Sequence, residues 1–384
     1  MKRNPKLESF WNKIPMLLLS VVLFFLFSAN SCESIEGNKI KSAAYWTSPV
    51  MNLEQAKSLA QHQVLIVDME NIINNKHVLK ALKSMNPDIK LLAYSNPIEF
   101  YDPAILNRPI QRKWLSEAQG YPDWFLRTGN NDPAVYWSNM VMMNISALCP
   151  KYEINVFGRK VLMTYSDWMA DKLLKEVLSD PIWDGYFMDN SGGNISWVYQ
   201  GKAYQLDING DGLSDPAYLI DNVWSQGIRN FLSKIREKRG KEFIMVGNKG
   251  SVEFMDLLDG KMFEAWPNDY LGSTQNRGWN QCMENALAME ALGAKYIFFQ
   301  ASNASRLEFT LASALLLDNV YVILGQDNIS IPPVFRAKVG KPSGPFVKAD
   351  YVYYRDFENG SVEVRPEDNW AKITIFSNQP LTDQ

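Results

Sequence analysis

Two acidic residues of this chain stand at the ends of short apolar segments. Residues 184–190 (Asp-Gly-Tyr-Phe-Met-Asp-Asn) form an apolar run that ends on Asp189 and Asn190. Residues 261–266 (Lys-Met-Phe-Glu-Ala-Trp) end in the same way on Glu264. Two carboxylates at the ends of two strands of one sheet could cleave a glycosidic bond, because that reaction uses one carboxyl as acid and the other as nucleophile or base.

The other apolar segments also end on polar or aromatic residues. Acids and amides bind sugar hydroxyls, and aromatic rings stack on the apolar faces of sugar rings, so this set predicts a carbohydrate substrate. None of these segment ends carries a cation, which a phosphorylated substrate would require. We predict that the substrate is bound by Asp68, Glu70, Tyr94, Asn190, Asn248, Trp266 and Gln300.

Each of these residues also has a purely structural explanation. Asp189 could cap a helix or make a turn. Asp68 and Glu70 could form simple ion pairs, and most tryptophans belong to the core, with Trp266 as the best candidate for a sugar platform. Glu264 is harder to explain in this way, because Glu is a poor capping residue and is rarely buried without a partner. The set as a whole favours a site.

The segments that carry these residues alternate with helical patterns. Short continuous apolar runs are typical of strands covered on both faces. Eight of them alternating with helices predict a (β/α)₈ TIM barrel, with its active site at the C-terminal ends of the strands. No glycine-rich phosphate loop follows the first strand, which argues against a dinucleotide fold. The predicted strands are 43–46, 64–69, 91–94, 185–188, 243–246, 261–263, 296–299 and 320–324, and helical patterns include 53–61, 74–84, 168–178, 223–238, 282–292 and 307–317.

We expect four consecutive parts in the chain. The third strand is followed by a long insertion, residues 97–160, which is rich in Pro, Asn and Trp, and long connections in compact domains tend to be functional. The C-terminal part alternates apolar and polar residues, as antiparallel strands do. The parts are a lipoprotein-type signal peptide (1–31), a polar tether (32–41), the barrel (42–345) and a small C-terminal β extension (346–384).

The first residues predict export. Four basic residues precede an apolar run at 14–27 that is too short to cross a bilayer comfortably, and small residues then lead to Cys32. This pattern resembles a bacterial lipoprotein signal, in which Cys32 would carry a lipid and tether the protein to the membrane at the cell envelope. An uncleaved anchor is the alternative, and it would also leave the globular part outside the cytoplasm.

Composition excludes several other functions. A net charge of −3 gives no electrostatic footprint for nucleic acid, and His62 and His77 are too few and too isolated for imidazole catalysis or a His-rich metal site. Cys149 and Cys282 could form a disulfide in an oxidising compartment or remain buried thiols. We expect a monomer.

Several motifs together resemble hypothetical glycosyl hydrolase family 15. They are DGYFMDN (184–190), FEAW (263–266), LLLDNVYV (315–322) and YRDFENGSVEV (354–364), and the resemblance spans residues 42–376. It implies a TIM barrel in the neighbourhood of α-galactosidase-like and polygalactosaminidase-like enzymes. In the α-galactosidase-like neighbours the carboxylate ending the fourth strand is the nucleophile and that ending the sixth is the acid/base. The resemblance implies these roles for Asp189 and Glu264, with Glu in place of the usual Asp.

A second motif lies in the loop after the fourth strand. Its oxygen-bearing side chains follow the spacing of a calcium-binding loop, with Gly at the sixth position, although Tyr218 replaces the Glu of the twelfth. The alternative is a solvated turn rich in Asp, Asn and Gly. We predict a structural Ca²⁺ bound by Asp207, Asn209, Asp211, Asp215 and the carbonyl of Leu213.

Three functions are therefore compared. The first is a surface-tethered glycoside hydrolase, acting on an extracellular or cell-envelope polysaccharide or oligosaccharide by a two-carboxylate mechanism. We expect retention, with inversion as the alternative, because the separation of the two acids decides the stereochemistry. The second is a carbohydrate-binding lipoprotein on a non-catalytic barrel. The third is a structural or partner-binding surface protein whose functional part is the calcium loop. The two carboxylates favour the first, and a cavity that contains both would separate it from the third.

Overall fold

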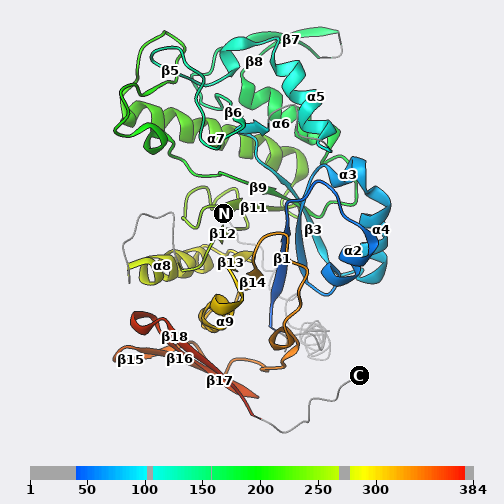
Figure 1. The fold of residues 1–384 in the computed structure, drawn as a ribbon, viewed down its shortest axis with the longest axis vertical. Coiled ribbons are helices and arrows are strands. Elements are labelled where there is room, and N and C mark those ends of the chain that lie inside the picture. The colour runs from blue at the N-terminus through cyan, green and yellow to red at the C-terminus, as the bar shows by residue number, and fades with distance from the viewer. Residues whose placement is uncertain (1–39, 102–106, 157, 268–276, 377–384) are drawn as a thin grey trace, which may run out of the picture.

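The computed structural model describes residues 40–101, 107–156, 158–267 and 277–376. In this part of the chain eight parallel strands close into a barrel, in chain order and with the last strand paired to the first (Figure 1). The predicted TIM barrel is confirmed. Its strands are β1 (Ser42–Trp46), β2 (Val64–Asp68), β3 (Lys90–Ser95), β9 (Gly185–Met188), β11 (Ile244–Asn248), β12 (Gly260–Phe263), β13 (Ile297–Ala301) and β14 (Val320–Leu324).

Helices connect most of these strands and cover the barrel. Two of them begin with a capping box: the side chains of Asn52 and Thr164 accept from the backbone N–H of the third helical residue, and the side chain of that residue accepts from the backbone N–H of Asn52 or Thr164. Between β11 and β12 the described chain makes turns instead of a helix. The helices are α2 (Leu53–Leu59), α3 (Asn71–Asn74), α4 (Lys76–Met85), α5 (Pro109–Ala118), α6 (Tyr165–Glu176), α7 (Ala217–Arg239), α8 (Arg277–Ala291) and α9 (Leu307–Leu315).

The barrel interior follows the two-residue alternation of strands. On β1, Ala43 and Tyr45 pack inside the barrel, whereas Ala44 and Trp46 pack against the surrounding helices. The inward positions of the other strands supply the remaining side chains of this inner cluster. They include Val64, Ile66, Leu92, Tyr94, Phe187, Ile244, Val246, Met262, Phe298 and Ile323.

This alternation determines which side chains reach the mouth of the barrel. Asp189, Asn248 and Glu264 each stand two positions beyond an inward residue of their own strand. All three therefore project toward the barrel axis at its carboxyl end.

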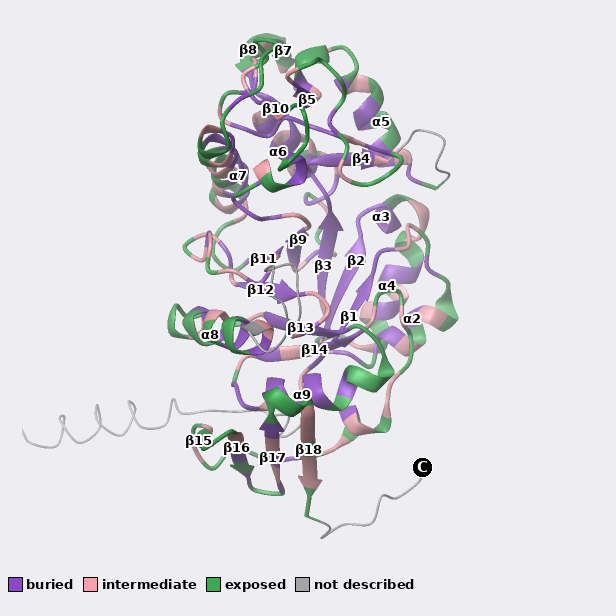
Figure 2. Ribbon diagram, turned by 60° about the vertical axis from the view of Figure 1, so that its left-hand side comes forward, coloured by how far each residue is buried: buried purple, intermediate pink, exposed green. Residues whose placement is uncertain are grey.

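The insertion after β3 forms a layer over one end of the barrel (Figures 1 and 2). Gly227, in the middle of α7, allows this layer to dock closely, because a Cβ there would lie 1.9 Å from the carbonyl oxygen of Ile145. One insertion strand also pairs with β10, from the connection between β9 and α7. The small strands are β4 (Glu99–Tyr101), β5 (Arg127–Thr128), β6 (Met140–Met142), β7 (Tyr152–Val156), β8 (Arg159–Met163) and β10 (Leu206–Asp207).

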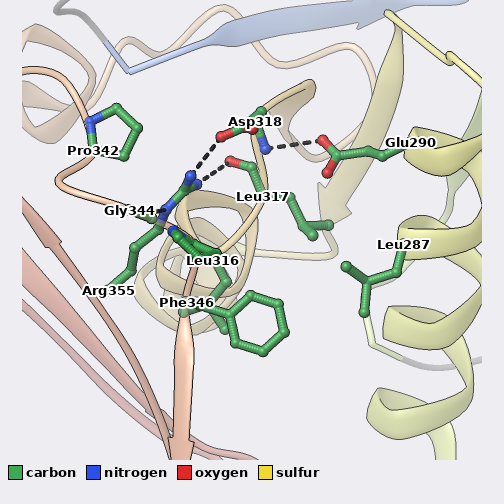
Figure 3. A pocket seen from close by; sticks show the side chains of 10 residues that line it. Leu287, Glu290, Leu316, Leu317, Asp318, Pro342, Gly344, Phe346 and Arg355 are labelled. Atoms are coloured by element: carbon green, nitrogen blue, oxygen red, sulfur yellow. Dashed lines mark hydrogen bonds and ion pairs between the residues drawn. The ribbon is translucent and has the colours of Figure 1, made fainter.

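A four-stranded antiparallel sheet, β15 (Val347–Ala349), β16 (Val352–Phe357), β17 (Gly360–Arg365) and β18 (Trp370–Ile375), packs on α9 at the opposite end of the molecule (Figure 2). The buried Arg355 anchors it. Its guanidinium donates to the carbonyls of Leu317 and Gly344 at 3.0 and 2.8 Å and to Asp318 at 2.6 Å (Figure 3). Arg355 thus satisfies a carbonyl left open beyond the end of α9.

Some sequence predictions concern residues that lie outside the described part. The leader, the tether to residue 39 and Cys32 all belong there. None of the helices in the described ranges is long and apolar enough to cross a membrane. Cys149 and Cys282 are both buried, and the structure shows thiols rather than a disulfide.

Candidate active site

A cavity of about 830 Å³ opens at the carboxyl end of the barrel. Asp189 and Glu264, which follow β9 and β12, both line it. Asn248 comes from β11, which lies between β9 and β12 in the barrel, and Tyr94 comes from β3, the neighbour of β9 on its other side. The structure therefore brings the two predicted carboxylates into one cavity, together with three of the seven predicted substrate-binding residues (Tyr94, Asn190 and Asn248).

Asp189 is held by its neighbours on both sides. The hydroxyl of Tyr94 donates to Oδ2 at 2.7 Å, and Nδ2 of Asn248 donates to Oδ1 at 2.8 Å. The backbone N–H of Asn190 adds a third bond to Oδ1 at 2.8 Å. These donors fix the orientation of the carboxylate, as preorganised catalysis requires.

The chain turns in the same unusual way after each of three polar residues. Asn190, Lys249 and Ala265, which directly follow Asp189, Asn248 and Glu264, have φ angles of 51°, 75° and 50°. The left-handed region is unfavourable for residues with a Cβ, by about 1–2 kcal/mol. Strain of this kind is retained where the surrounding structure demands it, and it concentrates at functional sites.

Tyr45 reports on the electrostatics of the cavity. It lines the cavity and is 3% exposed. Burial raises the pKa of Tyr45 well above its ordinary value, and the charges of Asp189 and Glu264 raise that pKa further. One phenol thus senses both carboxylates. The strand predicted at 43–46 ends on Trp46, and Tyr45 was not among the predicted site residues, although the inward alternation of β1 identifies it.

Trp266 and Gln300 support the site from behind, and the prediction that they bind substrate is corrected. Trp266 is 1% exposed and stacks on Phe299 with ring centroids 3.5 Å apart, so its faces belong to the core. Oε1 of Gln300 accepts from the N–H of Ala265 at 3.3 Å, and its carbonyl accepts from Trp266 at 2.7 Å. Both residues fix the backbone that carries Glu264.

Asp68 and Glu70 are also corrected, because both are 0% exposed and outside the described cavity lining. Asp68 forms a buried ion pair with Arg108, with Nη1 and Oδ2 2.6 Å apart. Glu70 accepts from the N–H groups of Ile110 and Gln111, both at 2.9 Å, and so caps the first turn of α5. Burial raises the pKa of Glu70 to about 7. The ion-pair alternative is right for Asp68, whereas Glu70 is a structural residue of another kind, a helix cap; the insertion supplies the partners of both acids.

The cavity also contains a cation, which was not among the predicted segment ends. Lys249 lines it and donates to Oδ1 of Asn194. Burial lowers the pKa of Lys249. A second lysine, Lys261, lies fully buried behind the site and donates to Oγ of Ser191 at 2.9 Å, and Ser191 donates to the carbonyl of Asn248. This chain ties the loop after β9 to the end of β11.

Glu99 is a third carboxyl near the cavity that sequence reasoning missed. It is 1% exposed, and Oε2 accepts from the amides of Asn96 at 2.9 Å and Asn190 at 3.3 Å. Burial raises the pKa of Glu99, and the charge of Asp189 raises it further. Glu99 comes from the insertion, where no repeating pattern marks it, and it orients two amides that line the cavity.

The predicted calcium loop is ordered by its own hydrogen bonds. Asp207 accepts from the N–H groups of Gly210, Asp211 and Gly212, and Asp215 accepts from that of Ile208 at 2.8 Å. Within the described ranges no group of three or more His, Cys, Asp or Glu side chains is arranged to hold a metal. As the loop stands, its carboxylates serve backbone donors, and the calcium site stays a prediction.

A smaller cavity of about 370 Å³ lies between α8, α9 and the C-terminal sheet (Figure 3). Glu290 and Asp318 line it, and Glu290 accepts from the N–H of Asp318 at 2.9 Å. Asp318 stands just before β14, so this cavity lies at the amino end of the strands. In TIM barrels that end serves stability, whereas active sites lie at the carboxyl end.

Paired carboxylates at the mouth of a TIM barrel, flanked by amides and aromatic rings, are typical of the active site of a carbohydrate-active enzyme. The model of hypothetical glycosyl hydrolase family 15 matches residues 83–361, and the chain belongs to this family. The family match identifies the protein as a glycoside hydrolase, as the resemblance implied. No curated protein matches the chain at a significant level.

Solved glycosidases are distantly similar in structure. A noncanonic maltogenic α-amylase of Thermotoga neapolitana is 11% identical, with a TM-score of 0.48 and 86% of each chain covered. An α-galactosidase of Geobacillus stearothermophilus is 8% identical, with a TM-score of 0.48 over 86% of this chain and 48% of that one. A dextranase of Flavobacterium johnsoniae is 12% identical, with a TM-score of 0.44 over 77% and 37%. This chain spans less than half of the latter two, and similarities this low say nothing about its substrate.

Proposed function

We propose that the protein cleaves a glycosidic bond in an oligosaccharide or polysaccharide, with Asp189 as nucleophile and Glu264 as acid/base. The observation that carries the proposal is the common cavity of the two carboxyls, with Asp189 oriented by Tyr94 and Asn248. A carboxylate fixed at the end of the fourth strand and a second carboxyl at the end of the sixth can act from opposite sides of a sugar ring.

The reaction would proceed in two steps. First, an oxygen of Asp189 attacks the anomeric carbon while the bond to the leaving oxygen breaks, and Glu264 gives its proton to that oxygen. The product is a glycosyl ester of Asp189. Second, a water molecule gives a proton to Glu264 and attacks the same carbon, which releases the sugar and regenerates both carboxyls.

Other residues of the cavity would orient the substrate. Tyr94, Asn190 and Asn248 present a hydroxyl and amides near Asp189. Tyr45 lies beside Tyr94, with ring centroids 5.7 Å apart, and also lines the cavity. These groups can hydrogen-bond ring hydroxyls next to the cleaved bond, where binding strengthened in the transition state raises the rate.

The test compares Asp189→Asn and Glu264→Gln with wild type on aryl glycosides and on bacterial polysaccharides. Glu284→Gln, on the exposed side of α8, is the matched control. Loss of an acid/base lowers the rate by about 10²- to 10⁴-fold. A dinitrophenyl leaving group needs no proton in the first step, so its kcat/KM should escape most of that loss in Glu264→Gln, whereas its kcat should still fall because the second step lacks its base. Asp189→Asn should abolish hydrolysis of every substrate.

Two results would contradict this assignment. Unchanged hydrolysis by Glu264→Gln would exclude it as the acid. Sugar binding that survives both substitutions, with no substrate ever hydrolysed, would favour the non-catalytic carbohydrate-binding lipoprotein. NMR of the first product separates retention from inversion, and inversion would make Asp189 a base instead of a nucleophile.

We also propose that the protein is exported, lipid-anchored through Cys32 at the cell envelope, and monomeric. The support is the basic, apolar and small-residue order of the leader, which lies outside the described residues. Metabolic labelling with a radioactive fatty acid should mark wild type but not Cys32→Ser. A Cys32→Ser protein that is labelled equally and stays in the membrane fraction would exclude lipidation of this residue.

The spacing of the 207–215 loop supports a proposed structural Ca²⁺. Calcium at about 1 mM should raise the melting temperature relative to EDTA, and Asp211→Ala should remove this response. Equal melting temperatures in calcium and EDTA would show that the hydrogen bonds of the loop are sufficient by themselves.

A further inference from the structure

Three aromatic side chains project at the rim of the catalytic cavity. Trp137 and Trp197 are 51% and 45% exposed, and both line the cavity, as does Tyr136. Tyr136 joins them, with ring centroids 5.0 Å from Trp137 and 5.1 Å from Trp197. Large rings left in water beside a cavity mark a binding surface, because burying them on a ligand releases the cost of their hydration.

The two segments that carry these rings are tied together. The N–H of Val135, beside Tyr136, donates to the hydroxyl of Tyr199 at 2.8 Å. The turn before Trp197 is capped by Asp221, which accepts from the N–H groups of Ile195 and Ser196 at 2.8 and 2.9 Å. The rings are thus held before a ligand arrives, which lowers the entropy lost on binding.

The cavity is also large for a single sugar ring. Its volume of about 830 Å³ lies near the upper end of the range of about 300 to 1,000 Å³ for small-molecule sites. The carboxylates stand at the strand ends, whereas Trp137 belongs to the insertion and Trp197 to the connection after β9. The space beyond the carboxylates is therefore walled by aromatic rings from outside the barrel.

We infer that Tyr136, Trp137 and Trp197 form a platform that binds the sugar units next to the one cleaved. The ligand class is an unbranched stretch of a neutral oligosaccharide or polysaccharide, whose apolar ring faces stack on the tryptophans. The inference rests on the proposed function, because it places the cleaved bond at Asp189 and Glu264. It makes the enzyme selective for chains over single glycosides.

The test measures binding and hydrolysis separately. Wild type, the double variant Trp137→Ala/Trp197→Ala and the control Tyr351→Ala are run in native gels that contain dextran, xylan, galactan or hydroxyethyl cellulose. Tyr351 is 70% exposed, lies in the turn between β15 and β16, and is not among the residues that line the cavity. The same proteins are assayed on nitrophenyl monosaccharides. Since about half of each tryptophan is exposed and neither belongs to the core, their removal should lower the melting temperature only slightly.

We expect at least one polysaccharide to retard wild type and Tyr351→Ala. The double variant should bind it about tenfold more weakly or worse, while hydrolysis of a nitrophenyl monosaccharide stays within about twofold. Equal retardation of all three proteins, or no retardation of wild type by any of the four polymers, would overturn the platform. Retardation that the double variant loses without any hydrolysis by wild type would support the platform and count against the hydrolase. Hydrolysis by wild type, together with polymer binding that the double variant retains unchanged, would support the hydrolase and count against the platform.

Discussion

Lys261 offers a quantitative test of the structure. It lies on β12, next to the inward-facing Met262, and is 0% exposed behind the loop that follows Asp189. Its Nζ donates to Oγ of Ser191 at 2.9 Å, and the site contains no carboxylate within ion-pair distance among the described residues. Burial lowers the pKa of Lys261 from 10.5 to about 7. The substitution Lys261→Met removes the charge and keeps an unbranched apolar side chain.

The magnitude follows from this pKa. At about 1.4 kcal/mol per pKa unit, the charged lysine costs the folded state about 5 kcal/mol. Because the folded pKa is depressed, this cost is fully present below pH 7, where both states carry the charge. From pH 7 to the ordinary pKa the unfolded chain binds a proton that the folded chain lacks, so stability rises with pH. Lys261→Met should therefore stabilise the protein near pH 6, and its advantage should shrink by about 2 kcal/mol between pH 7 and pH 9.

Urea denaturation followed by tryptophan fluorescence measures this difference. Wild type and Lys261→Met are compared at several pH values from 6 to 9, with Lys57→Met, which replaces an exposed lysine of α2, as the control. The difference in unfolding free energy between wild type and Lys261→Met cancels the contributions of other groups that titrate in the same pH range. A Lys261→Met protein that is less stable at every pH, or a difference that does not change with pH, would refute the reasoning.

Three further predictions test other parts of the structure. Tyr94→Phe removes a hydrogen bond to Asp189, and since bonds to charged groups contribute about 1.5–3 kcal/mol, kcat/KM should fall about 10- to 100-fold on an aryl glycoside; an unchanged value would exclude Tyr94 from the mechanism. Gly227→Ala should lower the melting temperature despite the helix propensity of alanine, because its Cβ would meet the carbonyl of Ile145; a rise would show that α7 can shift. The folded pKa of Glu70 is raised to about 7, so the stability that its protonated form contributes is fully present below the ordinary pKa and is lost as pH rises through 7. Because the side chain of Glu70→Gln does not titrate, the stability of this variant relative to wild type should rise by about 3 kcal/mol between pH 5 and pH 8. Equal pH profiles of the two proteins in denaturation would contradict this.

The barrel could be predicted because its signal is local and repeated. Each strand is a short apolar run, and each of the eight predicted runs overlaps a barrel strand. The same alternation that separates Tyr45 from Trp46 also places Asp189, Asn248 and Glu264 on the barrel axis. Strand boundaries moved by one or two residues, as at β11 and β13, because hydrogen bonding in the barrel extends a strand past its apolar core.

The outer part of the site could not be predicted, because it depends on contacts between distant segments. The ring of Trp137 meets the cavity only because the insertion folds back over the barrel and its segment is bonded to Tyr199. Asp68 was assigned to the substrate because nothing in the sequence links it to Arg108, which is 40 residues away. A buried charge takes whichever partner the fold supplies, and composition does not reveal which.

The sequence by itself determined the eight strands, the two carboxylates at the ends of the fourth and sixth, and the family, because periodicity and short motifs are carried by neighbouring residues. Only the tertiary structure decided which polar residues face the cavity and which are buried supports. Asp189 and Asn190 differ from Asp68 and Glu70 in nothing that composition shows. The difference lies in what the insertion packs against each pair: an open cavity over the first, and Arg108 with the first turn of α5 over the second.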